Sequence, residues 1–139
     1  MRKRYGVILA VVWYIVFFFY REGWVADWKP FAINNRATFY FDPETISHLP
    51  GNSLRVWVKD VLLQEGIIDV VRNYGQEFKD VEFIKSLYEY NCTENKMRVL
   101  SVTYYSKTGL VITTSDRQTE WQFNPPESIG DLLSKKVCQ

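Results

Sequence analysis

The sequence predicts an α+β protein: a single antiparallel sheet of about six strands, with a middle helix and a C-terminal helix packed on it and one disulfide bond. Three observations lead to this prediction. Most of the chain beyond residue 26 alternates apolar and polar residues, which is typical of half-buried strands. Two segments instead repeat apolar residues at helical spacing. The chain also has only two cysteines, Cys92 and Cys138.

The first 26 residues are expected to form a signal peptide or an uncleaved N-terminal anchor. Arg2-Lys3-Arg4 precedes an apolar run from Tyr5 to Tyr20, the order found in export signals. Cleavage is expected close to Ala26, although the large Trp24 stands at position −3. The 16-residue run is slightly shorter than the roughly 20 residues that span a bilayer. Both interpretations place the rest of the chain outside the cytoplasm, in the periplasm or at the cell surface.

Residues 27–139 are expected to form one domain of 113 residues. A chain of this length can bury a real core without a metal. The whole chain has a net charge of +1, but its first 26 residues carry four positive charges and one negative, so residues 27–139 carry −2. Because no Lys/Arg cluster remains in this region, nucleic acid is not expected as a partner.

Five segments of alternating pattern are predicted as strands, and hairpin turns between neighbours imply antiparallel pairing. The turn Ser106–Gly109 joins the last two of the five. The five predicted strands are Ala37–Phe41, Leu54–Lys59, Tyr88–Cys92, Leu100–Tyr104 and Leu110–Thr114. Weaker patterns favour strands at Trp28–Ile33 and Trp121–Phe123.

Two segments are predicted as helices because their apolar residues fall on one helical face. The middle helix is expected near Glu65–Tyr74, with Gly75 ending or kinking it. The C-terminal helix is expected near Pro126–Lys136, since a Pro-Pro pair is a natural helix entry and lysines occupy the last turn.

The two cysteines are predicted to bond to each other, because export places them in an oxidising compartment. Cys92 falls on a strand face and Cys138 at the end of the C-terminal helix. The bond would therefore tie that helix to the sheet. Closing a 46-residue separation restricts the unfolded chain by about 4 kcal/mol on the loop-entropy relation.

Residues that usually carry catalysis are sparse. His48 is the only histidine, and it cannot form a base–nucleophile pair with the adjacent Ser47 because neighbours on an extended chain point to opposite faces. A hydrolase using Asp42, Glu44 or His48 would need these groups to converge in a cleft. We therefore expect a non-enzymatic protein with no metal and no organic cofactor.

The polar side of one predicted strand is the candidate binding surface. Arg55, Trp57 and Lys59 alternate with the apolar residues of that strand. One interpretation is that a helix covers this face, since both faces of a sheet can be packed. The other is an exposed aromatic anchor flanked by cations, a composition typical of protein-binding hot spots.

Five motifs in order resemble the surface-adhesin protein E family of bacterial exported domains. They are Phe39-Tyr40-Phe41-Asp42-Pro43-Glu44-Thr45-Ile46, Arg55-Val56-Trp57-Val58, Tyr90-Asn91-Cys92, Trp121-Gln122-Phe123-Asn124-Pro125-Pro126-Glu127-Ser128 and Val137-Cys138. The resemblance runs from Trp28 to Cys138. It implies a small antiparallel sheet with a helix packed on it and tied by a disulfide, and it assigns residues 27–139 to an adhesin-E-like domain.

The resemblance also implies a function. Family members include an exported surface protein of a pathogen that contacts matrix proteins such as vitronectin and laminin. We therefore expect a binding module that contacts an extracellular matrix or envelope protein through the face around Trp57. The alternative is a periplasmic envelope protein with a structural role or a small apolar ligand held between sheet and helix. An exposed Trp57 favours the first, and an enclosed apolar pocket favours the second.

Overall fold

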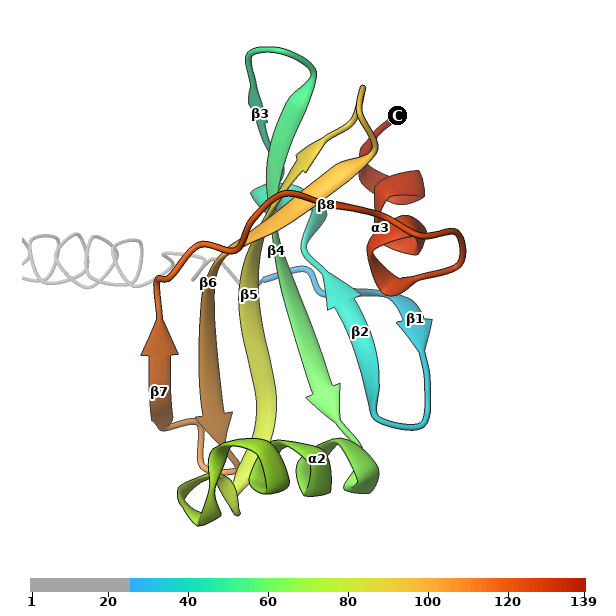
Figure 1. Cartoon of the computed structure of the whole chain (residues 1–139). Helices are drawn as coiled ribbons and strands as arrows, with labels where there is room; N and C mark the ends of the chain where they lie inside the picture. The colour runs from blue at the N-terminus through green and yellow to red at the C-terminus, as the bar shows by residue number, and fades with distance from the viewer. Residues whose placement is uncertain (1–25) are drawn as a thin grey trace, which may run out of the picture.

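The computed structural model describes residues 26–139, so the expected leader lies outside the described residues apart from Ala26. The described chain forms one open antiparallel sheet with two helices (Figure 1). Six strands lie in the order β1-β2-β4-β5-β6-β7, while β3 pairs with β4 and β8 pairs with β6. The strands are β1 (Lys29–Ile33), β2 (Ala37–Phe41), β3 (Ser47–Leu49), β4 (Ser53–Leu62), β5 (Val81–Asn91), β6 (Lys96–Ser106), β7 (Val111–Ser115) and β8 (Gln122–Phe123).

The predicted fold class is confirmed, with differences in extent. Both of the weaker strand predictions are confirmed, as β1 and β8. Strand β5 begins at Val81, seven residues before the predicted start, because Val81–Leu87 pairs with β4 and β6 although its polar and apolar residues do not alternate strictly. His48 lies outside the predicted strands, but it belongs to β3, opposite Leu54.

Both helices pack on the same face of the sheet, which we call the helix face. Along β4, Val58 joins the apolar cluster beneath helix α3 (Ile129–Val137), and Leu62 joins the cluster beneath α2 (Gln64–Tyr74). Residues two and four apart on a strand share a face, so α2 and α3 cover different ends of one surface. The side chains of Arg55, Trp57 and Lys59 therefore lie on the opposite side, which we call the open face.

The ends of the helices follow local capping. Gly75 ends α2 as predicted, with φ +118°, a conformation that side chains rarely adopt, and the short 3₁₀ segment η2 (Gln76–Phe78) follows. Helix α3 begins at Ile129, three residues after the predicted start. The reason is that Ser128 caps the helix, its hydroxyl accepting from the backbone N–H of Asp131 at 3.2 Å.

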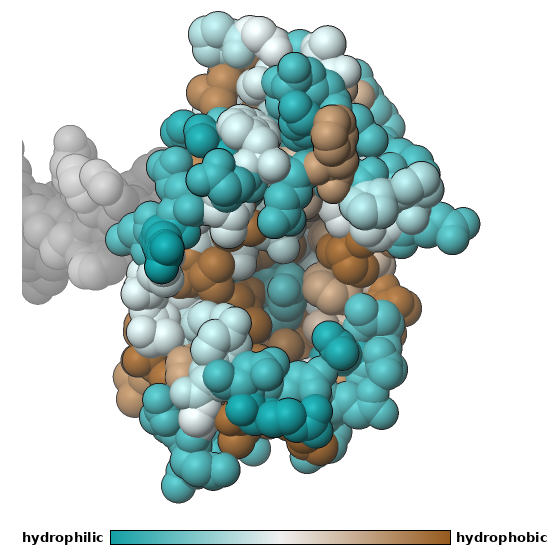
Figure 2. Space-filling model, in the orientation of Figure 1, coloured by the Kyte–Doolittle hydropathy of each residue, from teal (hydrophilic) through white to brown (hydrophobic). Residues whose placement is uncertain are grey.

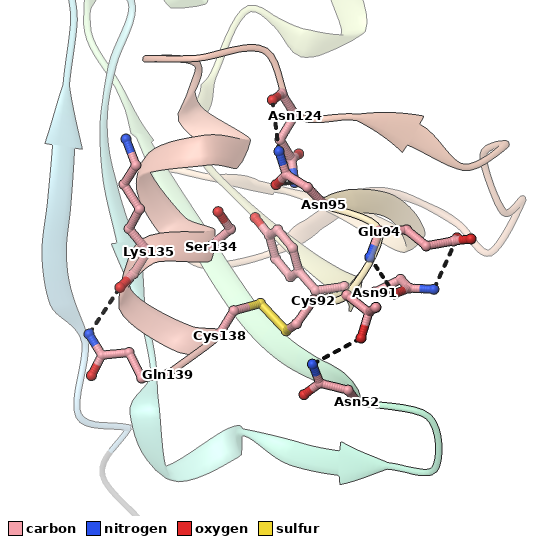
Figure 3. Close-up of a disulfide and its surroundings, with 12 residues drawn as sticks. Asn52, Asn91, Cys92, Glu94, Asn95, Asn124, Ser134, Lys135, Cys138 and Gln139 are labelled. Atoms are coloured by element: carbon pink, nitrogen blue, oxygen red, sulfur yellow. Dashed lines mark hydrogen bonds between the residues drawn. A yellow bond between two sulfur atoms is a disulfide. The ribbon is translucent and has the colours of Figure 1, made fainter.

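The predicted disulfide between Cys92 and Cys138 is present, with Cα atoms 5.5 Å apart (Figure 3). It joins the residue after β5 to the C-cap of α3. The fully buried Tyr90 adds a second tie, because its hydroxyl donates to the carbonyl of Gly130 at 3.1 Å. Helix α3 is thus fixed to the sheet at both its ends, which sets its position on the helix face.

Candidate functional site

Trp57 occupies the centre of the open face. Its side chain lies between those of Arg55 and Lys59 on β4, opposite Leu87 of β5, and the residue is half-buried. Neither α2 nor α3 covers this face, as the interpretation of a helix over Trp57 would have required. The candidate residues are therefore brought together as the alternation predicted.

A buried carboxylate stands on one side of Trp57. Glu89 of β5 lies directly opposite Arg55, and its side chain is only 7% exposed. Arg55 donates to one carboxylate oxygen at 2.7 Å, and Arg98 of β6 donates to the other at 2.9 Å. Burial raises the pKa of Glu89, but hydrogen bonds from Arg55 and Arg98 outweigh it and hold that pKa below its ordinary value. The Glu89 charge is consequently neutralised, and this cluster of two arginines and one carboxylate keeps one net positive charge.

An exposed indole covers the second arginine of this cluster. The Arg98 guanidinium carbon lies 4.6 Å from the ring centroid of Trp121, a residue of the segment between β7 and β8. The arrangement is a cation–π contact of the kind that stabilises a partly desolvated arginine. A second such contact involves β8, where the Lys96 ammonium lies 4.8 Å from the ring centroid of Phe123. Aromatic side chains are thus held against the sheet by cations.

Two lysines occupy the other side of Trp57. Lys59 of β4 and Lys85 of β5 are directly opposite in register. Like charges in this position repel each other. Burial lowers the pKa of Lys85, and the charge of Lys59 lowers it further. Among residues 26–139, no carboxylate lies within ion-pairing distance of either ammonium group.

Aromatic rings surround the two lysines. The Nζ of Lys59 lies 4.6 Å from the centroid of Phe83, and the Nζ of Lys85 lies 5.2 Å from that of Tyr105. These two rings stack on each other with centroids 4.7 Å apart, and Trp28 lies within 6 Å of both ammonium groups. The rings hold the cations in place without neutralising them. The lysine pair therefore remains available to an anionic group.

The residues considered for hydrolysis have other roles. Asp42 is buried, and its carboxylate accepts from the backbone N–H of Glu44 at 3.0 Å, capping the 3₁₀ segment η1 (Pro43–Thr45). Glu44 and His48 are exposed on the surface. Asp42 thus serves the turn that Asp-Pro predicts.

Within residues 26–139, no three His, Cys, Asp or Glu side chains are grouped as metal ligands would be. In the same range, no helix has the length and apolarity needed to cross a membrane.

The β5 residues of this surface were not identified from the sequence. Lys85, Phe83 and Glu89 complete the open face, but they become neighbours of the predicted residues only through the β4–β5 register. The strand partners are separated by α2, so no hairpin turn specifies their alignment. The signal that was present is the identical spacing of Arg55 to Lys59 and Lys85 to Glu89, which places a charge at each end of both segments.

A disulfide-linked helix on one face of an open antiparallel sheet, with cations and aromatic rings on the other, defines a small α+β domain with one face that neither helix covers. The sequence profile of the surface-adhesin protein E family matches residues 28–139. The chain therefore belongs to that family, and the predicted resemblance is confirmed. Family membership supports a surface-adhesin-like binding role, an exported location and a non-enzymatic protein.

Solved structures agree with this assignment at the level of the fold. A crystal form of Haemophilus influenzae protein E matches with a TM-score of 0.55 and 14% identity, covering 82% of this chain and 95% of that one. Protein E from non-typeable H. influenzae matches with a TM-score of 0.54 and 12% identity, covering 84% of this chain and 78% of the other. No curated protein sequence matches this chain.

Proposed function

We propose that this chain is an exported, non-enzymatic binding module that contacts a protein partner through its open face, with Arg55, Trp57 and Lys59 in the contact. Membership of the surface-adhesin protein E family supports the adhesin-like role. The half-buried Trp57 between flanking cations supports the choice of face, because aromatic residues and arginine dominate binding hot spots.

One observation carries the proposal: Lys59 and Lys85 face each other across neighbouring strands. Two like charges side by side cost stability in the free protein. A carboxylate from a partner would relieve that repulsion and form charge-assisted hydrogen bonds with both ammonium groups. The surrounding rings would supply apolar contact area around the charges. The partner is therefore a protein that presents acidic side chains to this face.

The proposal is tested by measuring binding to immobilised vitronectin and laminin, the matrix proteins implied by the resemblance. We expect Trp57→Ala and the double variant Lys59→Ala/Lys85→Ala each to weaken binding roughly tenfold or more. Added salt should weaken binding of the wild type more than that of the double variant, because it screens the lysine charges. Lys107→Ala is the matched control, since it removes an exposed lysine from the β6–β7 turn.

The outcomes are distinct. Equal binding by wild type, Trp57→Ala and the double variant would show that the open face is not the contact. Absence of binding by the wild type to either protein would remove these matrix proteins as partners. Loss of binding in Lys107→Ala alone would move the contact to the β6–β7 turn.

Export is the second part of the proposal, with residues 1–26 acting as a signal peptide. N-terminal sequencing of protein from fractionated cells should give a chain beginning near Asp27. An intact Met1 in the membrane fraction would favour the anchor, and a cytosolic chain would contradict export. Protease treatment of intact cells then separates the surface, where the domain is cut, from the periplasm, where it is protected.

A further inference from the structure

Asp60 is a carboxylate within the otherwise apolar helix face. It lies between Val58 and Leu62 on β4 and shares their face of the sheet. Its register partners are Phe39 in β2 and Ile84 in β5. Its Oδ1 atom is buried and has no hydrogen-bond partner among residues 26–139. A buried acceptor without a partner costs on the order of 1–3 kcal/mol of stability, so Asp60 destabilises the free protein.

Asp60 lies in the interval between the two helix contacts. Val58 belongs to the cluster under α3, and Leu62 belongs to the cluster under α2. Figure 2 shows that this face is hollowed between α2 and α3, with hydrophobic surface around much of the hollow. The interval between the helices is therefore open to a small molecule.

The groups around Asp60 are aromatic and apolar. Burial raises the pKa of Tyr88 of β5 and of Tyr104 of β6, and the charge of nearby Asp60 raises both pKa values further. Tyr74 of α2 lies beyond them, its ring 5.8 Å from that of Tyr104. Burial raises the pKa of Asp60 to about 7, because no cation in the described chain compensates its charge.

We propose that the hollow around Asp60 binds a small organic amine, whose ammonium group donates to the Asp60 carboxylate at the oxygen other than the buried Oδ1 and whose apolar body packs between α2 and α3. An ionised carboxylate only accepts hydrogen bonds, so the ligand must donate. Tyrosine faces favour a cation over a neutral donor. A free small molecule fits better than a partner's lysine, because Asp60 is only partly exposed and is recessed between the two helices. This site lies on the opposite side of the sheet from the proposed protein contact.

The test is isothermal titration calorimetry of the folded, disulfide-bonded protein with phenethylammonium as the probe. We expect binding to the wild type, and binding at least roughly tenfold weaker to Asp60→Asn, because a charge-assisted hydrogen bond is lost. The matched probe 2-phenylethanol has the same ring without the charge, and it should bind both proteins equally weakly. Asp69→Asn, a carboxylate paired with Arg36 and Arg72 on α2, is the control variant and should bind like the wild type.

Location is checked by backbone amide chemical shifts during the titration. Shifts should concentrate at Val58, Ile84 and Tyr104, and a shift pattern confined to the open face would overturn the proposal. Equal amine binding by wild type and Asp60→Asn, or no amine binding, would also overturn it. Equal affinity for 2-phenylethanol would mark a purely apolar site, and tighter binding of the peptide Gly-Lys-Gly would mark a protein contact; both results contradict the proposal.

Discussion

Glu89 and Asp60 are carboxylates buried on opposite faces of the same sheet. On the open face, Glu89 receives hydrogen bonds from Arg55 and Arg98 at 2.7 and 2.9 Å. On the helix face, Asp60 keeps one oxygen without a partner in the described chain. The pKa of Glu89 is lowered, whereas burial raises the pKa of Asp60 to about 7. Burial raises the pKa of both carboxylates, and arginine partners offset that effect only at Glu89.

The two faces also differ in the interactions that stabilise them. The helix face is an apolar core closed by α3 and fastened by the Cys92–Cys138 disulfide. The open face consists of charge pairs and cation–π contacts. We infer that the helix face provides most of the stability and that the open face is the part free to serve a partner.

Of the changes proposed here to test how the two faces differ, removing the disulfide should have the largest effect on the free energy of unfolding. The double variant Cys92→Ser/Cys138→Ser should lose about 4 kcal/mol of unfolding free energy, because the unfolded chain regains the entropy of a 46-residue closure. Urea unfolding of oxidised and reduced wild type measures the same quantity. A loss below about 1 kcal/mol would show that packing alone holds α3 to the sheet.

The charge of Asp60 should make stability depend on pH. Its pKa in the folded state, about 7, exceeds the ordinary 3.8, so the folded protein binds this proton more tightly than the unfolded chain. Stability should therefore fall as pH rises from about 4 to 8, by at most about 4 kcal/mol from this group. Asp60→Asn should remove that part of the slope in urea unfolding at several pH values. An unchanged slope would mean that Asp60 is solvated.

The Glu89 carboxylate should make stability depend on pH in the opposite direction, and Glu89→Gln should remove that dependence. With its carboxylate gone, Arg55 and Arg98 lose their common partner, and the cost should be about 2 kcal/mol near neutral pH. Because the pKa of Glu89 is lowered from 4.5, the stabilisation is present above that value and disappears as pH falls below it. The exposed Glu82→Gln on the same strand is the control and should change stability by less than about 0.5 kcal/mol. Equal effects of the two substitutions would contradict the pairing.

Lys85→Thr should give the smallest change, and it should be a gain. Relieving the repulsion with Lys59 and placing a β-branched residue on the strand should stabilise the fold by about 0.5 kcal/mol. Binding to an acidic partner should weaken at the same time. Thermal unfolding and binding, measured on the same preparation, test whether Lys85 lowers stability while strengthening binding. A loss in both would show that Lys85 is structural.

Much of the fold could be predicted from the sequence, because strand alternation and helical spacing are local patterns. The pairing of Cys92 with Cys138 followed from there being no other cysteine. The face of Arg55, Trp57 and Lys59 could also be predicted, since a period of two fixes which side chains point together.

The partners across strands could not be predicted, for a physical reason. A slip of one residue between β4 and β5 would reverse the faces, and α2 separates the two strands in sequence. The sequence therefore did not indicate which β4 residues lie opposite Glu89 and Lys85. Asp60 gave no signal either, because the pair Lys59-Asp60 resembles an ordinary polar strand end. That it is buried follows only from the positions of the two helices.

The edge strand β1 has a mechanical consequence for a protein that must hold on to a partner. Among the strands of residues 26–139, β1 pairs only with β2; its register shifts between Pro30 and Ala32, and proline has no N–H to donate. A pull between residue 26 and the open face loads this short ladder first. The disulfide encloses residues 92–138 and carries none of that load. Under tension, β1 should therefore peel away and lengthen the connection, while the surface around Trp57 stays folded and attached.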